Sequence, residues 1–138
     1  MTGRVVGMDD KPFGGVVIFA YHTDANGLYR THGDVPRGAA DPRKLEGKLR
    51  TGADGTYRID TIKPGAYPSR NNPAHIHFVI MPPGGKRQSE ILWFDGDPLI
   101  TAAMHEKYDR FGNYSPIRVA TRGADGALHC TRDFKSAW

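Results

Sequence analysis

Residues 72–81 read NPAHIHFVIM, and this stretch has the pattern of a buried strand at the centre of a sheet. Alternate side chains of a strand share one face, so His75 and His77 point the same way, about 7 Å apart along the strand. A neutral imidazole inside a core needs hydrogen-bond partners for both ring nitrogens. The pair is therefore either one edge of a metal site or two hydrogen-bonded core residues.

Short apolar or alternating stretches recur along the rest of the chain and are separated by turn sequences. The turns read DANG (24–27), GADG (52–55 and 123–126) and PPGG (82–85), and their Asn-Gly, Asp-Gly and Gly-Gly pairs suit tight reversals. This punctuation favours an all-β, antiparallel sandwich over alternating βαβ units. The predicted strands span residues 4–8, 15–22, 45–51, 56–60, 75–81, 90–94, 117–121 and 127–134.

Residues 97–112, DPLITAAMHEKYDRFG, depart from this pattern and predict one short helix. Asp97 is suited to cap it and Gly112 to end it. Residues 30–44 show no periodicity and are interpreted as a long surface loop. The apolar positions that recur at helical spacing are Ile100, Met104, Tyr108 and Phe111.

The composition fits one domain over residues 1–138, with 38% hydrophobic residues and a net charge of +4. The basic residues between Arg30 and Arg50 are interspersed with acidic ones, which argues against a nucleic-acid groove. The N-terminus has no apolar signal-peptide core, and no apolar run is long enough for a membrane span. We therefore expect a cytoplasmic protein with neither a membrane nor a nucleic-acid partner. The single Cys130 excludes an intrachain disulfide and a CxxC metal site.

Two tyrosines are the candidate partners of the histidine pair in a metal site. Tyr67 lies between Gly65 and Pro68, and Tyr29 follows the turn that ends the 15–22 strand. A trivalent cation can displace the phenolic proton at neutral pH, and phenolate oxygen is a hard donor that suits Fe(III). Two tyrosines and two histidines would give an N2O2 set whose phenolates offset most of a +3 charge. A cupin-type carboxylate is missing at Ile80 and Met81.

The order of four motifs resembles the intradiol ring-cleaving catechol dioxygenases, such as protocatechuate and hydroxyquinol dioxygenases. The resemblance covers residues 3–97, and its motifs are DANGLYR, GKLRTGADGTYRIDTIKPGAYP, PAHIHF and FDGDP. It implies a transthyretin-like or immunoglobulin-like β-sandwich that holds a non-haem Fe(III) ion. By motif position, Tyr29 and His75 match the equatorial ligands, and Tyr67 and His77 match the axial pair.

The resemblance also implies an activity. A catechol would bind the Fe(III) as its dianion, and Tyr67 would leave the metal to take up one of the two phenolic protons. With O2, the ring would open between its two hydroxylated carbons to give a muconate-type product.

The chain departs from the family pattern beside the predicted ligands. The family usually has an arginine three residues before the first ligand histidine, where this chain has Asn72, with Arg70 two residues earlier. Ile91 stands where the family tends to have glutamine, and Trp93 where it tends to have tyrosine. A fixed cation near a developing oxyanion lowers a barrier by a few kcal/mol. Asn72 is therefore a candidate catalytic residue, with a neutral amide where the family usually has a cation.

Two other functions fit the same residues. One is a non-catalytic transthyretin-like sandwich that binds a metal or a small aromatic compound; Asn72 and Ile91 favour it. The other is a different O2-dependent reaction on a phenolic compound at the same iron site. A homo-oligomer would have to assemble through surfaces of the sandwich itself. Several residues are better explained as structural than as site residues: Tyr57, Tyr21, His22, Trp93, Phe94, Cys130, His32 and Asp34.

Overall fold

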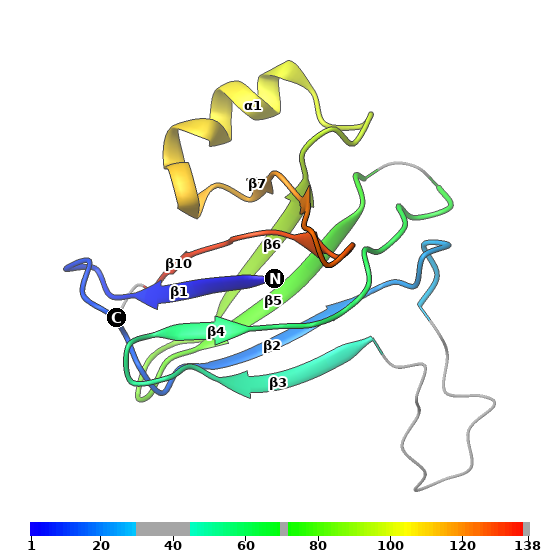
Figure 1. The fold of residues 1–138 in the computed structure, drawn as a ribbon. Helices are drawn as coiled ribbons and strands as arrows, with labels where there is room; N and C mark the ends of the chain where they lie inside the picture. The colour runs from blue at the N-terminus through cyan, green and yellow to red at the C-terminus, as the bar shows by residue number, and fades with distance from the viewer. Residues whose placement is uncertain (30–44, 70–71, 137–138) are drawn as a thin grey trace, which may run out of the picture.

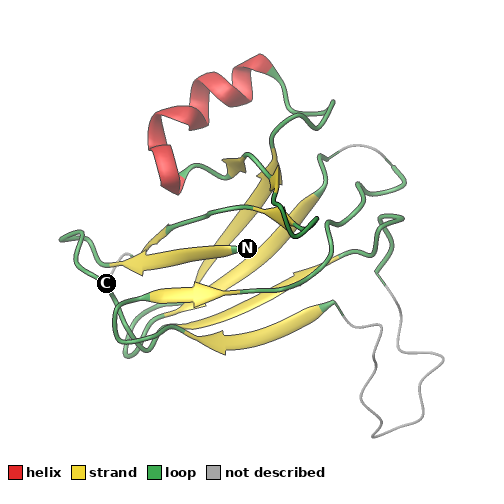
Figure 2. Cartoon of the chain, in the orientation of Figure 1, coloured by secondary structure: helices red, strands yellow, loops and turns green. Residues whose placement is uncertain are grey.

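Two β-sheets pack face to face in the computed structural model, which describes residues 1–29, 45–69 and 72–136 (Figure 1). A five-stranded sheet has the order β3-β2-β5-β6-β7, and a three-stranded sheet has the order β10-β1-β4. The predicted all-β sandwich is therefore confirmed (Figure 2). The strands are β1 (Thr2–Val6), β2 (Val17–His22), β3 (Glu46–Arg50), β4 (Thr56–Arg58), β5 (His75–Met81), β6 (Gln88–Phe94), β7 (Ile117–Arg118), β8 (Thr121–Arg122), β9 (Leu128–His129) and β10 (Phe134–Lys135).

Most strand pairs are antiparallel, as predicted, but β1 pairs with β10 and β6 with β7 in parallel. The two predicted C-terminal strands are each divided. The turn at residues 123–126 folds β8 back on β9 as a separate hairpin, which leaves β7 on β6 and β10 on β1. The local pattern predicted extended structure correctly here, but it could not predict which partner each short segment would pair with.

Alternation along the strands builds the core between the sheets. In β2 the side chains of Ile18, Ala20 and His22 are buried, whereas those between them are only half-buried. In β5 the alternate positions Ile76 and Phe78 are buried in the same core. The other large core residues come from both sheets: Val5, Tyr57, Ile80, Leu92, Phe94 and Phe134.

The same alternation places His75 and His77 on the opposite face of β5, away from this core. His77 lies directly across from Tyr21 of β2 and from Ile91 of β6, and His75 lies across from Trp93. All of these side chains are therefore on the outer face of the five-stranded sheet. The interpretation of the histidines as two residues of the main core is excluded by this register.

One α-helix, α1 (Ala102–Tyr108), follows β6, as predicted, and continues into a 3-10 segment, η2 (Asp109–Tyr114). The predicted cap is wrong: Thr101 Oγ1 accepts the capping hydrogen bond from the Met104 amide. Asp97 instead accepts from the amides of Leu99 and Ala74, and thus ties the β6–α1 turn to the start of β5. Gly112, with φ of 55°, interrupts η2. Neither helical segment is long and apolar enough to cross a bilayer within the described ranges.

Structural roles are confirmed for several polar or aromatic residues. His22 is buried, with Nδ1 2.7 Å from the Thr23 carbonyl oxygen and Nε2 2.8 Å from Thr61 Oγ1. Tyr57 is 6% exposed and donates to the Arg132 carbonyl oxygen.

Cys130 is partly buried against the core. Phe94 lies in the core, but Trp93 does not, because its position in the pleat places it on the outer face. His32 and Asp34 lie outside the described residues.

The turn after β2 packs backbone against backbone on the segment before Tyr67. The Asp24 carbonyl oxygen accepts hydrogen bonds from the amides of Gly27, at 3.0 Å, and of Gly65, at 2.9 Å. The Asp24 carboxylate accepts from the amides of Asn26 and Leu28, which closes the turn on itself. We call the contact between residues 24–28 and 65–66 the backbone clamp.

Two glycines make the backbone clamp possible. A Cβ atom at Gly27, where φ is 78°, would overlap the Ala66 carbonyl oxygen. A Cβ atom at Gly65 would overlap the Ala25 carbonyl oxygen and the Gly27 amide nitrogen. Since the obstacles are backbone atoms, a side chain could be accommodated only if the two segments moved apart. The clamp is what holds Tyr29 and Tyr67 at a fixed separation.

Gly65→Ala is expected to lower the free energy of unfolding by about 1 to 3 kcal/mol, because it overpacks a backbone contact. It should also move the segments that carry Tyr29 and Tyr67 apart. Gly47→Ala is the matched control, because a Cβ at Gly47 in β3 meets nothing within 4 Å. Urea unfolding of both variants measures the difference. Equal stability of the two variants would show that the clamp does not constrain the fold.

Candidate metal centre

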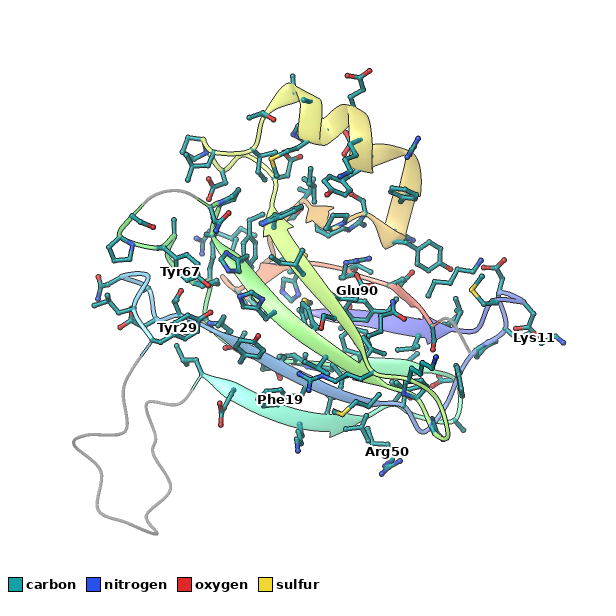
Figure 3. All side chains as sticks on the ribbon, turned by 180° about the vertical axis from the view of Figure 1, so that it is seen from behind. Lys11, Phe19, Tyr29, Arg50, Tyr67 and Glu90 are labelled. Carbon is teal, nitrogen blue, oxygen red and sulfur yellow. The ribbon has the colours of Figure 1, made fainter. Side chains whose placement is uncertain are left out.

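Four side chains from three separate segments bring their donor atoms together at one end of the outer sheet face. Tyr29 Oη lies 3.0 Å from Tyr67 Oη, and Tyr67 Oη lies 3.0 Å from His75 Nε2 and 3.3 Å from His77 Nε2. The two histidine Nε2 atoms are 3.0 Å apart. Figure 3 shows the labelled tyrosines side by side at this end of the sheet. We call these four residues the donor cluster.

Each member of the donor cluster is positioned by its own segment. The histidines are held by the register of β5, and their rings meet edge to face with centroids 4.6 Å apart. The tyrosines come from the loops on either side of the backbone clamp. Tyr67 also packs edge to face against His75, with ring centroids 4.8 Å apart. The donor atoms of the four side chains therefore converge, although one residue separates the two histidines in the strand.

The second nitrogen of His75 fixes which nitrogen faces the cluster. Nδ1 lies 2.7 Å from the Pro73 carbonyl oxygen, and a carbonyl can only accept, so Nδ1 carries the proton. In the neutral ring Nε2 then presents its lone pair to the other donors. A hydrogen bond from the far nitrogen to a backbone carbonyl is the usual support for a metal-ligating histidine.

Burial shapes the protonation of the cluster. It lowers the pKa of His77 below 6.5, with His75 contributing further, so the imidazole is neutral at pH 7. Burial and the hydrogen bond with Tyr67 raise the pKa of Tyr29 well above its ordinary value of 10. The protein alone therefore does not ionise this phenol at neutral pH. A multivalent cation, by contrast, would gain from displacing the proton.

The donor cluster fits a transition-metal ion. Adjacent ligands bound at about 2.1 Å lie roughly 3 Å apart. Tyr67 Oη lies at 3.0 to 3.3 Å from each of the other three donor atoms, and the two histidine nitrogens are 3.0 Å apart. Phenolate oxygen with imidazole nitrogen is a hard set that suits Fe(III) better than soft ions. Among the described residues, no group of three or more His, Cys, Asp or Glu side chains is arranged to hold a metal. The tyrosines are therefore indispensable to a metal site here.

Tyr21 supports the cluster from behind. Its ring stacks on His77 with centroids 4.7 Å apart and an angle of 15° between the planes. Phe19 stacks on Tyr21 in turn, at 5.5 Å. Tyr21 was predicted to have a structural role, and its stack against His77 supports the position of that ring. In the sequence, Phe19 and Tyr21 alternate with Ile18 and Ala20. This alternation could have predicted that both aromatic rings lie on the face of the sheet opposite the core.

Ile91 and Asn72, at which the chain departs from the family pattern, differ in their position relative to the donor cluster. Ile91 is directly across from His77, so an apolar side chain stands beside this candidate ligand. Asn72 is exposed in the turn before β5 and makes no hydrogen bond to the four donors. Arg70 lies outside the described residues.

A pocket of about 490 Å³ begins at His77 and was not predicted from the sequence. It lies between β6 and the α1–η2 segment, with Trp93 and Tyr108 on its walls. Met104 and Tyr108 recur at helical spacing and lie in α1, as predicted, but no residue of α1 is buried. The helix therefore shapes a cavity rather than completing the core.

The family model described as “Dioxygenase” matches residues 1–110. Catechol 1,2-dioxygenase 1 of Acinetobacter lwoffii is 34% identical in an alignment of 114 positions that covers 71% of this chain and 36% of that protein. The protocatechuate 3,4-dioxygenase beta chain of Burkholderia cepacia is 37% identical in an alignment of 107 positions that covers 72% of this chain and 46% of that one. The chain thus matches less than half the length of either relative.

Solved structures show the same fold. The dioxygenase domain of a dioxygenase–carbohydrate-binding protein fusion from Streptomyces sp. SirexAA-E superposes with a TM-score of 0.74 at 27% identity, covering 99% of this chain and 77% of that one. An intradiol ring-cleavage dioxygenase from Tetranychus urticae gives a TM-score of 0.70 at 22% identity, over 99% and 78% of the two chains. The order of motifs, the sandwich and these relatives agree, and the chain belongs to the intradiol dioxygenase family.

Proposed function

We propose that this chain binds Fe(III) through Tyr29, Tyr67, His75 and His77 and uses O2 to open a catechol ring between its two hydroxylated carbons. The convergence of the four donor atoms, each within 3.3 Å of Tyr67 Oη or of a neighbouring donor, is the observation that carries the proposal. The product would be a muconate-type dicarboxylate. The named relatives act on catechol-type compounds, which supports the substrate class.

When bound, the ferric ion would supply Lewis acidity and a template that holds the two substrate oxygens. Its two phenolate ligands offset two of its three positive charges. The His75 ring, 5% exposed and held by Pro73, keeps one side of the site rigid and dry. Tyr29 is 46% exposed, which leaves the opposite side open to a substrate.

Tyr67 is the proposed proton acceptor of the donor cluster. Its oxygen is the only one of the four donor atoms that lies within hydrogen-bond distance of all three others. Tyr67 would thus be placed to take up a proton from a substrate hydroxyl, while Tyr29, His75 and His77 would hold the ion. We propose that the side chain at position 72 affects the rate of ring cleavage. A cation there would stabilise the negative charge that develops on the substrate, and the neutral Asn72 does not supply one.

Metal or aromatic binding without turnover is the second candidate. The observation that favours it is Ile91, which places a side chain without hydrogen-bonding groups directly across from His77. Binding would then perturb the metal site, but no O2 would be consumed. A different O2-dependent reaction on a phenolic compound would consume O2 without forming a muconate.

Iron-loaded protein is expected to be reddish, because tyrosinate bound to Fe(III) has a visible charge-transfer band. Tyr29→Phe and Tyr67→Phe should each shift and weaken the band, and His75→Ala should lose most of the iron. Tyr21→Phe is the matched control, since it keeps the ring stacked on His77 and removes a phenol outside the cluster. Absorption spectra and iron content per chain measure these outcomes. A colourless protein that retains no Fe(III) would contradict the proposed site.

Ring cleavage is tested with a panel of simple catechols on the iron-loaded protein. We expect one O2 consumed per ring and the appearance of muconate absorbance, with both lost in His75→Ala. A change in the charge-transfer band without O2 uptake would instead establish the non-catalytic binder. O2 uptake with a product other than a muconate would establish the different oxidation.

Asn72→Arg is expected to raise turnover of simple catechols at least about tenfold, because a fixed cation near a developing oxyanion stabilises the transition state. Asn72→Gln controls for side-chain length, and Asn72→Lys separates charge from the planar guanidinium geometry. Steady-state O2 uptake by the three variants gives the comparison. Unchanged or lower turnover in Asn72→Arg would show that residue 72 is not the position where a cation acts.

A further inference from the structure

The pocket shares one residue, His77, with the donor cluster and therefore lies beside it. His77 presents Nε2 to the cluster, and one face of its ring is covered by Tyr21. The pocket extends from His77 along β6, past Ile91, toward the α1–η2 segment. A ring held at the cluster by two adjacent oxygens has its other carbons directed away from the metal. The pocket is therefore placed to receive a substituent on those carbons.

Aromatic side chains form the walls of this pocket. Trp93 and Tyr108 lie in contact, with ring centroids 5.6 Å apart and planes at 57°. Phe111 lines the same space but is 45% exposed, although it is a large apolar side chain. Aromatic rings pack favourably on one another in offset or edge-to-face arrangements. The exposed Phe111 and the volume of about 490 Å³ together leave room for a further ring.

The charged groups at the far end of the pocket neutralise each other. Arg132, with its side chain 3% exposed, donates from Nη2 to Glu90 Oε2 at 2.9 Å. Glu90 Oε1 accepts from Gln88 Nε2 at 2.6 Å. Nη1 of Arg132 donates to the carbonyl oxygens of Tyr114 and Asp133. The pocket therefore has no net charge to attract a carboxylate.

We propose that this pocket binds an uncharged aryl substituent on the catechol ring, so that the chain favours aryl catechols over carboxylated ones. The proposal rests on the proposed function, because the donor cluster must hold the dihydroxy ring. Trp93, Tyr108 and Phe111 bind the second ring, and the Glu90–Arg132 pair disfavours a negative charge on it. Ile91 contributes an apolar side wall beside His77.

Calorimetry of iron-loaded protein under argon measures binding without turnover. We expect 4-phenylcatechol to bind at least about tenfold more tightly than catechol, because the added ring buries apolar surface. The same compound with a carboxylate on its second ring should bind about tenfold more weakly than 4-phenylcatechol. Equal affinities of catechol and 4-phenylcatechol, in a protein that cleaves catechol normally, would overturn the pocket while leaving the proposed function in place.

Substitutions assign the effect to the pocket. Tyr108→Ala and Phe111→Ala should each reduce the preference for 4-phenylcatechol over catechol to about threefold or less. Leu128→Ala, which truncates an apolar residue of similar exposure (40%) outside the pocket, should leave the preference unchanged. Glu90→Gln should narrow the penalty on the carboxylated compound, because Arg132 loses its counter-charge. An unchanged preference in both aromatic variants would overturn the assignment.

Metal-free protein tests the pocket separately from the cluster. The chain has two tryptophans, so a Trp138→Phe background leaves Trp93 as the sole indole fluorophore. Titration with 4-phenylphenol should quench its emission, and Tyr108→Ala should weaken the quenching at least about threefold. Quenching here, together with no ring cleavage by the iron-loaded protein, would refute the proposed function but keep the pocket. Absence of quenching would count against the pocket itself.

Discussion

The backbone clamp, the contact of residues 24–28 with residues 65–66, is the constraint on which the candidate metal centre depends. β5 can present two imidazoles by register alone, but the two phenols come from loops that share no strand. Main-chain hydrogen bonds accepted by the Asp24 carbonyl oxygen, and the lack of side chains at Gly27 and Gly65, let these loops touch directly. Ligand positions set by backbone contacts tolerate little adjustment, and Fe(III) selectivity requires such a fixed arrangement of hard donors.

Local sequence predicted the parts of the fold that are decided locally. Alternation and turn glycines were enough to place every long strand, including β5, and to favour a sandwich. The short C-terminal strands were predicted as extended segments but not with their partners, because a pair of two-residue strands is selected by tertiary contacts rather than by propensity. The helix was predicted with the wrong cap for a similar reason. Asp97 caps nothing in α1 because the Ala74 amide, from the start of β5, uses its carboxylate.

The four candidate ligands could be named only because chemistry and motif order were combined. Two histidines in a strand are ambiguous, and the tyrosines stand 38 residues apart. Nothing in the spacing indicates that Gly27 and Gly65 meet. For Trp93 the sequence was misleading. A tryptophan in an apolar strand was interpreted as a core residue, but its register with His75 places it on the outer face of the sheet. The burial preference of a residue type does not determine which face of a sheet it occupies.

The metal centre and the neighbouring pocket are built on different kinds of structure, and His77 connects them. The donor cluster is determined by β5 and by two loops locked backbone to backbone, so most substitutions there would disturb several ligands together. The pocket is lined by side chains of β6 and of a helix with no buried residue. Replacing Tyr108 or Phe111 changes the wall of the pocket without moving β5. The proposed iron chemistry and the proposed substrate preference therefore depend on separate parts of the structure, because α1 packs beside the sheet edge rather than into the core.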